Sequence, residues 1–204
     1  NTILLVFTIL PVLPVSEQKE ESFSRLFAAT ERGSYISYSW GEQWERLRSE
    51  VRGYSESLTT FACLGPVVFT GGTEGLFVSR DYGESYLRVE TFPGNEVTTI
   101  TTARLFELEP VILVGTTSGI YRSMDGGTKW NQIGSTQLQG IIHEIKWPGP
   151  ELFVASDDGL YMSTDIGDSW KKLGSDLPAR AFLSIALSRF FLADPKIFQK
   201  WIKF

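Results

Sequence analysis

The chain has 204 residues, of which 42% are apolar and 21% charged, so it can build a packed core. Its formal net charge of -5 argues against a nucleic-acid partner, because no basic stripe is present to neutralise phosphates. Cys63 is the only cysteine, which excludes an intramolecular disulfide, and His143 is the only histidine, which excludes a histidine cluster for a metal.

The first apolar stretch of the chain runs over residues 3–15. It has the hydrophobicity of a secretory signal, but it lacks a basic segment and contains Pro11 and Pro14. It is shorter than the about 20 residues that a membrane-spanning helix needs, so no transmembrane segment is predicted. Two interpretations stay open. Residues 1–12 are a signal-peptide remnant, which favours an extracytoplasmic or secreted protein, or residues 13–16 are a first strand.

Short apolar runs, each followed by a polar turn and a glycine, recur along the rest of the chain. Their β-branched and aromatic residues, bounded by Gly, Asp, Ser and Pro, predict strands, and no helical periodicity is visible across the repeats. These runs are Leu26 to Ala29 before Gly33, Val67 to Thr70 before Gly75, Val111 to Val114 before Gly119, and Leu152 to Ala155 before Gly159. Further strands are predicted ahead of them over 58–64, 97–103 and 141–147, and after them over 86–89, 130–133 and 170–173.

A phrase of Ser, any residue, Asp, any residue and Gly, closed by an aromatic residue three positions later, links the third and fourth predicted strands. The four copies of this Ser-x-Asp phrase occupy residues 37–44, 79–86, 123–130 and 163–170, and their third positions are 42, 44 and 40 residues apart. Four strands in a unit of about 40 residues are typical of a β-propeller blade, a small sheet that must stack on its neighbours to bury both faces.

We therefore predict an all-β protein, a single-domain β-propeller of four-stranded antiparallel blades. The predicted blades cover approximately residues 11–50, 54–92, 95–135 and 138–175, with a partial fifth over 180–204. In the fifth, Phe182 to Ser188 is expected to be the first strand, and Asp194 to Phe198 the loop and second strand. Because this unit is unfinished, we expect an incomplete or open ring whose unpaired terminal blades can self-associate.

The Ser-x-Asp phrase has a mechanical explanation at the turn. An Asp carboxylate can accept hydrogen bonds from backbone N–H groups two residues on, Ser can bond locally in the same way, and Gly supplies a positive φ. The aromatic residue can fill the space between stacked sheets. With these features the phrase resembles the Asp-box, or BNR repeat, of sialidases, xyloglucanase-type glycoside hydrolases, sortilin-type receptor domains and photosystem II assembly factors. The resemblance covers about residues 24–174.

Copy one departs most from this pattern, because Ser39 replaces the Asp and Gln43 the usual Ser or Thr. Its turn is therefore expected to be the least firmly held. Tyr86 replaces Trp in copy two, and Lys129 replaces Ser or Thr in copy three. The residues predicted to build the structural turns are Ser37, Ser39, Gly41, Trp44, Ser79, Asp81, Gly83, Tyr86, Ser123, Asp125, Gly127, Trp130, Ser163, Asp165, Gly167 and Trp170.

The carboxylates could also suggest a glycosidase, which needs two of them about 5 to 9.5 Å apart across the scissile bond. Asp81, Asp125 and Asp165 recur at the same turn of different blades, so they are predicted to tie turns and to lie whole sheets apart. Asp157 and Asp158 fall between second and third predicted strands, where a solvated turn is expected. The Arg-Ile-Pro segment of sialidases is absent.

Arginine and histidine side chains are the other candidates for chemistry. Arg104 and Arg122 could be pocket arginines, but Arg122 directly precedes a Ser of the phrase, where the other copies have an apolar residue, so a surface charge or snorkelling stem is predicted. His143 lies in an alternating strand and is expected to face a blade or the channel. No catalytic, metal-binding or cofactor-binding residue is predicted, and no cofactor.

The resemblance implies two functions. The first is a noncatalytic β-propeller scaffold or binding module for a protein or carbohydrate partner, favoured because the repeats are nearly uniform and no blade carries a long inserted loop. The alternative is part of a sialidase- or xyloglucanase-like glycoside hydrolase whose catalytic residues lie mostly outside this chain. Both stay open, because one scaffold of this kind hosts many activities.

Overall fold

The protein is described by a computed structural model that covers residues 5–8, 25–30, 33–47, 58–103, 110–138, 140–174 and 181–187. These ranges contain strands and no helix. The strands of the first two sheets are β1 (Leu5–Thr8), β2 (Leu26–Thr30), β3 (Gly33–Ser37), β4 (Glu45–Arg46), β5 (Leu58–Leu64), β6 (Val67–Gly72), β7 (Gly75–Ser79) and β8 (Leu87–Arg88). Those of the third and fourth are β9 (Val97–Ala103), β10 (Val111–Thr116), β11 (Gly119–Ser123), β12 (Asn131–Ile133), β13 (Ile142–Lys146), β14 (Leu152–Ser156), β15 (Gly159–Ser163) and β16 (Lys171–Leu173).

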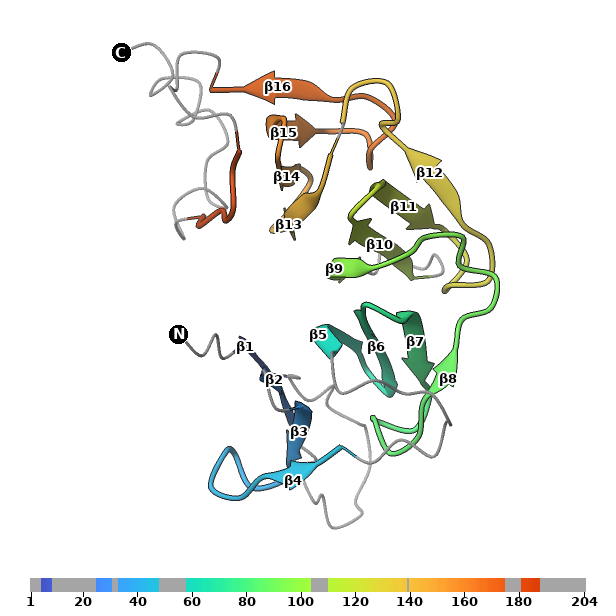
Figure 1. Ribbon diagram of the computed structural model, residues 1–204, viewed down its shortest axis with the longest axis vertical. Coiled ribbons are helices and arrows are strands. Elements are labelled where there is room, and N and C mark those ends of the chain that lie inside the picture. Colours follow the sequence, from blue (N-terminus) through green and yellow to red (C-terminus); the bar gives the residue numbers. More distant parts are fainter. Residues whose placement is uncertain are drawn as a thin grey trace, which may run out of the picture.

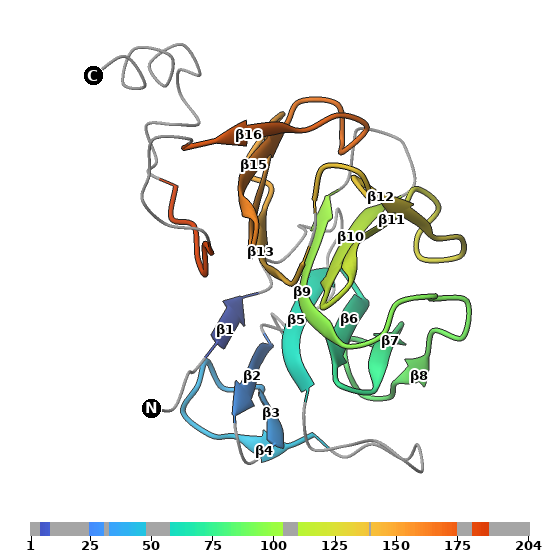
Figure 2. The ribbon, with the colours of Figure 1, turned by 45° about the horizontal axis from the view of Figure 1, so that its top comes forward.

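The strands pair in chain order, each antiparallel to the next, into four blades of four strands. The blades lie side by side around an arc, with the first strand of each on the inner side and the last on the outer side (Figure 1). A tilted view shows the same succession (Figure 2). The four sheets do not close into a ring. The prediction of an all-β propeller with an open ring is confirmed.

The hydrophobic core lies between blades, because strand residues alternate between the two faces of each sheet and both faces need cover. Phe27 of β2 stacks on Phe61 of β5 with ring centroids 5.3 Å apart, which joins the first blade to the second. Equivalent clusters join the second blade to the third and the third to the fourth. Their fully buried members include Phe69, Val97, Ile112, Leu113, Ile120 and Ile142.

The inner strands are also joined by threonine side chains at β-bulges. The register of β5 shifts at Thr59, and its hydroxyl donates to the Val97 carbonyl of the next inner strand at 3.1 Å. Thr98 of β9 stands at the corresponding bulge and donates to the Ile142 carbonyl of β13. His143 occupies the bulge of β13. Successive inner strands are therefore held by side-chain bonds as well as by packing.

The two ends of the arc differ from the predicted blade boundaries. The strand that pairs with β2 is β1, which precedes residue 11, and the expected strand over residues 13–16 lies outside the described residues. Residues 181–187 form no strand; the N–H of Phe182 donates to the Ser156 backbone carbonyl, and that of Ile185 donates to the Glu144 carboxylate rather than to a partner strand. The expected first strand of a fifth blade is thus not formed in its described part. The remainder, including residues 194–198, lies outside the described residues.

Candidate functional site

The four Ser-x-Asp turns, residues 37–44, 79–86, 123–130 and 163–170, share one hydrogen bond. In each of them the first Ser is buried, and its hydroxyl accepts the N–H of the Gly four residues on. The N to Oγ distances are 2.9 Å for Gly41 and Ser37, 2.7 Å for Gly83 and Ser79, 2.8 Å for Gly127 and Ser123, and 2.8 Å for Gly167 and Ser163. The N–H of the turn Gly is satisfied in every copy by a buried hydroxyl, which explains the recurrence of Ser.

The aspartate of each of the last three turns accepts a bond from further along the chain than expected. Asp81 Oδ1 accepts the N–H of Ser85 at 3.0 Å, and Asp165 Oδ1 that of Ser169 at 2.9 Å, both four residues on. The prediction of an N–H two residues on is wrong, because that N–H belongs to the turn Gly and is taken by the Ser hydroxyl. Asp125 follows the same rule with Lys129 at 2.8 Å.

These bonds fix the charge state of the aspartates. Bonds from the Ser169 hydroxyl and N–H, with one from Ser163, lower the pKa of Asp165 to about 2. Partial burial raises the pKa of Asp81, but bonds from Ser79 and Ser85 outweigh it and lower the pKa to about 2. The pKa of Asp125 is lowered as well, chiefly by the Lys129 N–H. All three are therefore ionised hydrogen-bond acceptors at neutral pH.

The first turn makes the same backbone arrangement without an aspartate. Ser39 Oγ accepts the N–H of Gln43 at 2.8 Å, in the place of the Asp carboxylate. Its contact with Ser37 Oγ is long, at 3.5 Å. Ser39 therefore accepts the same backbone hydrogen bond as the Asp of the other turns, but it has no second side-chain oxygen that could accept another.

Two consecutive left-handed residues form the tip of every turn. The Gly has a φ of 91° to 93° in all four copies, as the sequence predicted. The residue before it is also left-handed, with φ of 56° at Trp40, 61° at Tyr82, 69° at Gly126 and 58° at Ile166. Such a φ is costly for a non-glycine residue, and most of all for the β-branched Ile166. This second left-handed position was not predicted.

Each later turn packs on the preceding blade. A Cβ at Gly83 would lie 2.6 Å from the Phe27 ring, and one at Gly167 would lie 2.5 Å from Ile133. Tyr86, Trp130 and Trp170 belong to the three interblade clusters, as the predicted aromatic plugs. Trp44 has no preceding blade to enter among the described residues and is 37% exposed.

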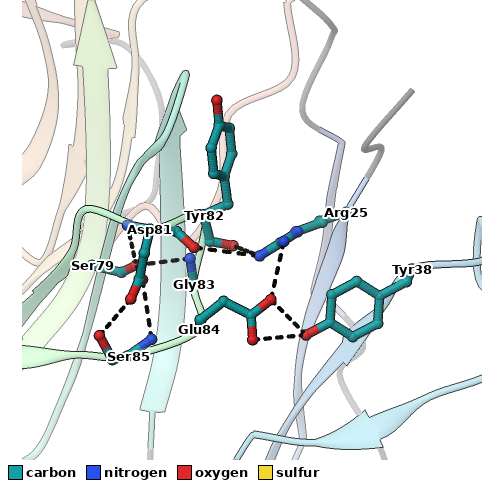
Figure 3. A network of polar contacts seen from close by, with 8 residues as sticks. All are labelled: Arg25, Tyr38, Ser79, Asp81, Tyr82, Gly83, Glu84 and Ser85. Atoms are coloured by element: carbon teal, nitrogen blue, oxygen red, sulfur yellow. Dashed lines mark hydrogen bonds and ion pairs between the residues drawn. The ribbon is translucent and has the colours of Figure 1, made fainter. Parts of the chain in front are cut away.

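Arg25 of the first blade binds the tip of the second blade's turn (Figure 3). Its side chain is 10% exposed, its Nη1 lies 2.6 Å from the Tyr82 carbonyl oxygen, and its Nη2 lies 3.0 Å from Glu84 Oε1. The guanidinium carbon lies 5.0 Å from the ring centroid of Tyr38 and 5.5 Å from that of Tyr82. Tyr38 donates to the same Glu84 carboxylate. One cation is thus held by a carbonyl, a carboxylate and two aromatic faces.

Arg122 of the third blade binds the fourth blade's turn in the same way. Its Nη1 lies 2.7 Å from the Ile166 carbonyl oxygen and 2.8 Å from Asp168 Oδ1. Its side chain is only 17% exposed, so the prediction of a surface charge or snorkelling stem is wrong. The other blades have apolar residues at this strand position, so nothing in the sequence indicated that Arg122 has a specific acceptor in the next blade. Arg104 lies outside the described residues.

The third turn explains what the arginine contact requires. Arg25 and Arg122 each bind two acceptors of the facing turn. These are the carbonyl of the left-handed residue and the carboxylate of the acid directly after the Gly. The third turn has Thr128 after its Gly, and the facing residues of the second blade are Val67 and Val78, which pack on the core. Among the three turns that pack on a preceding described blade, the two with an acid after the Gly receive an arginine and the one with Thr128 does not.

Asp157 and Asp158 lie at the opposite end of β15 from the Ser-x-Asp turn. Asp157 Oδ1 is 2.7 Å from His143 Nε2, and this bond is the main cause that lowers the Asp157 pKa. Asp158 accepts a bond from Tyr161, which lowers the Asp158 pKa, and pairs with Lys172 Nζ at 3.3 Å. Both carboxylates are about half exposed but have protein partners, which the prediction of a solvated turn did not include.

An open cleft of about 530 Å³ lies between the outer strands of the first blade and the second blade's turn. Its lining includes Tyr38, Glu45, Arg46 and Glu84. Such a lining is mostly polar, whereas small-molecule pockets are usually apolar with a few polar groups. The turns are therefore better suited than this cleft to be an interaction site.

The described part of the chain holds no group of three His, Cys, Asp or Glu residues that could bind a metal ion. It also contains no helix with the length and hydrophobicity needed to cross a bilayer. The thiol of Cys63 in β5 is partly buried, and burial raises its pKa to about 12.

No family model matches the sequence, and no curated protein matches it. Solved structures do match. An ancestral GH74 enzyme is 16% identical with a TM-score of 0.61 over 74% of this chain. The extracellular domain of BT4673 from B. thetaiotaomicron is 17% identical with a TM-score of 0.56 over 78%, and YCF48 bound to D1 peptide is 17% identical with a TM-score of 0.55 over 74%. The chain spans 22%, 21% and 52% of these structures, so the likeness shows the propeller fold alone.

Proposed function

We propose that the chain is a noncatalytic part of a β-propeller that binds a protein partner, and that its turns are Asp-box turns. The observation that carries the proposal is the state of the repeated carboxylates. Asp81, Asp125 and Asp165 are each occupied by hydrogen bonds from their own turn, and each lies in a different blade. A carboxylate whose oxygens accept hydrogen bonds from its own turn stabilises that turn, which is a structural role.

The electrostatics support the same conclusion. A glycosidase needs one carboxylic acid with a raised pKa, which donates a proton to the leaving group. Among the described residues, every Asp or Glu with a clearly shifted pKa has it lowered. Their hydrogen-bond donors stabilise the charged form, which is the reverse of what a general acid needs.

A protein partner is favoured over a glycan by the surface of the turns and by one structural neighbour. Tyr38, Trp40, Trp44 and Tyr82 are large aromatic residues that remain exposed at the turns, and such residues are enriched at protein interfaces. YCF48, a propeller of similar fold, is bound to a peptide. A glycan ligand and self-association through the end blades are separate outcomes for experiment.

The alternative function is part of a glycoside hydrolase whose catalytic residues lie mostly outside this chain. The likeness to GH74 enzymes favours it. Release of reducing ends from xyloglucan oligosaccharides, and of fluorophore from a sialoside, distinguishes the two. We expect no turnover by the chain or by the longest protein that contains it. Turnover above that of a heat-inactivated control would overturn the noncatalytic proposal.

A further inference from the structure

We propose that the Trp40-Gly41-Glu42 turn is a recognition site for an arginine side chain presented by a protein partner. The inference deepens the proposed function, on which it rests, because it names the chemistry of the partner. It starts from Tyr82-Gly83-Glu84, an aromatic-Gly-Glu sequence of the same kind, which binds Arg25 of the neighbouring blade (Figure 3).

The two turns have the same backbone conformation. Trp40 and Gly41 have φ of 56° and 91°, and Tyr82 and Gly83 have 61° and 93°. The N–H of the following Glu points to the same carbonyl in both, at 3.1 Å for Glu42 to Ser39 and 3.4 Å for Glu84 to Asp81. The Trp40 carbonyl and the Glu42 side chain therefore start from the positions that their counterparts use to bind Arg25.

The acceptors of the first turn are free. Trp40 is 61% exposed, Glu42 is exposed, and the Glu42 carboxylate has no hydrogen bond or ion pair within the described part of the chain. The turn projects from the end of the arc, away from β5 to β8 (Figure 1). Beside it lies Trp44, whose counterpart Tyr86 is only 3% exposed because it is packed against the first blade.

The chemistry of the turn selects a guanidinium. A carbonyl and a carboxylate at two separate points suit the fixed fork of arginine better than the single ammonium of lysine. The indole of Trp40 offers the aromatic face with the strongest cation–π attraction, in the place of Tyr82. We therefore expect the partner to present an arginine immediately before an apolar strand, as Arg25 precedes β2.

The fourth blade of a second copy, docked as successive blades dock, does not supply a cation to the site. If the fourth blade docked on the first as successive blades do, Glu151 and Met162 would stand at the strand positions of Arg25 and Arg122. Neither is a cation, and Glu151 would face Glu42 with the same charge. The charge pattern thus disfavours this docking of a second copy, and we assign the site to a partner that supplies the missing cation.

The test uses a peptide with the sequence SRLFAAT, that of residues 24–30, blocked at both ends. Binding to the ¹⁵N-labelled chain is followed through the indole N–H signal of Trp40, which the Trp40→Phe variant identifies. We expect a saturable shift of this signal, and about tenfold weaker binding for a peptide with citrulline in place of arginine. Glu42→Gln should weaken binding of the arginine peptide by a similar factor. Glu45→Gln is the matched control, because it removes an exposed charge from the adjacent strand β4 and should leave binding unchanged.

Three results would overturn the proposal: no saturable shift at Trp40, equal binding of the citrulline peptide, or an equal effect of Glu42→Gln and Glu45→Gln. Its failure is distinguishable from failure of the proposed function. Loss of peptide binding without glycoside turnover removes only the arginine site. Glycoside turnover removes the noncatalytic proposal whatever the peptide does.

Discussion

The Nη1 atom of Arg122 lies 2.7 Å from the carbonyl oxygen of Ile166, in the next blade. Arg25 makes the same contact with the Tyr82 carbonyl at 2.6 Å, although it precedes the second strand of its blade and Arg122 lies in the third strand of its own. Arginines at two different positions in the blade thus donate to the same backbone group, the carbonyl of the left-handed residue before the turn Gly. Interblade adhesion here depends on a charged residue as well as on the apolar clusters.

Arg122→Met should destabilise the protein by about 1 to 3 kcal/mol, because it leaves a carbonyl and a carboxylate without their charged donor. Asp168→Asn should cost less, at most about 1 kcal/mol, since this carboxylate is 67% exposed and a surface ion pair contributes little. Urea unfolding followed by tryptophan fluorescence measures both. Equal midpoints for Arg122→Met and the wild type would show that the contact adds no stability.

Ser39→Asp should stabilise the first turn. The carboxylate would keep the bond from the Gln43 N–H and gain a closer one from the Ser37 hydroxyl, which now lies 3.5 Å from Ser39 Oγ. One added hydrogen bond to a charged group is worth roughly 1 kcal/mol or more before solvent screening, so a rise of a few degrees in Tm is expected. Ser39→Ala is the opposite control and should lower Tm. A lower Tm for Ser39→Asp would contradict the idea that this turn is the least firmly held.

Ile166→Gly should be more stable than Ile166→Ala by about 1 kcal/mol. Both variants lose every side-chain contact beyond Cβ, but only glycine relieves the left-handed φ of 58°. The third turn already has Gly126 at this position with a φ of 69°. Thermal unfolding of the pair measures the difference. If alanine were equal or better, the left-handed conformation would carry no strain at this site.

Acid should weaken the turns. The pKa values of Asp81 and Asp165 are about 2 in the folded protein and 3.8 ordinarily. Because the folded values are the lower ones, the stability that these groups add is present above about pH 4 and is lost as pH falls toward 2. The free energy of unfolding should therefore fall more steeply over this range in the wild type than in the double variant Asp81→Asn, Asp165→Asn. Parallel curves would mean that the aspartates are not bonded as described.

Local features of the chain predicted most of the fold. The strands over 58–64 and 97–103 match β5 and β9 at both ends, because Val, Ile, Thr and Phe runs bounded by turn residues specify strands locally. Left-handed Gly41, Gly83, Gly127 and Gly167 were predictable for the same reason. The course of residues 181–187 was not predictable, because a strand needs a partner strand, and here the Ile185 N–H bonds to the Glu144 carboxylate and the Phe182 N–H makes a single bond to the Ser156 carbonyl.

The candidate site was predicted only in part. Ser, Asp and Gly of each turn act within one short segment, so their spacing is visible in the sequence. The arginine contacts join residues 57 and 44 positions apart and start from different strands, so they leave no periodic signal. The sequence shows an acid after the turn Gly in three copies, at Glu42, Glu84 and Asp168. Its role as an acceptor is recognisable only once the structure places an arginine of the preceding blade beside Glu84 and Asp168.

The repeat, the four-stranded blade and the Ser-x-Asp turn are encoded locally in the amino-acid sequence, since hydrophobic patterning and turn chemistry act over a few residues. Which turns receive an arginine depends on tertiary packing, because stacking of the blades brings distant charges within hydrogen-bond distance. The same stacking shows why the first turn is different. Its Trp40, Glu42 and Trp44 have the chemistry of an interblade contact, yet they lie on a face that no described blade covers.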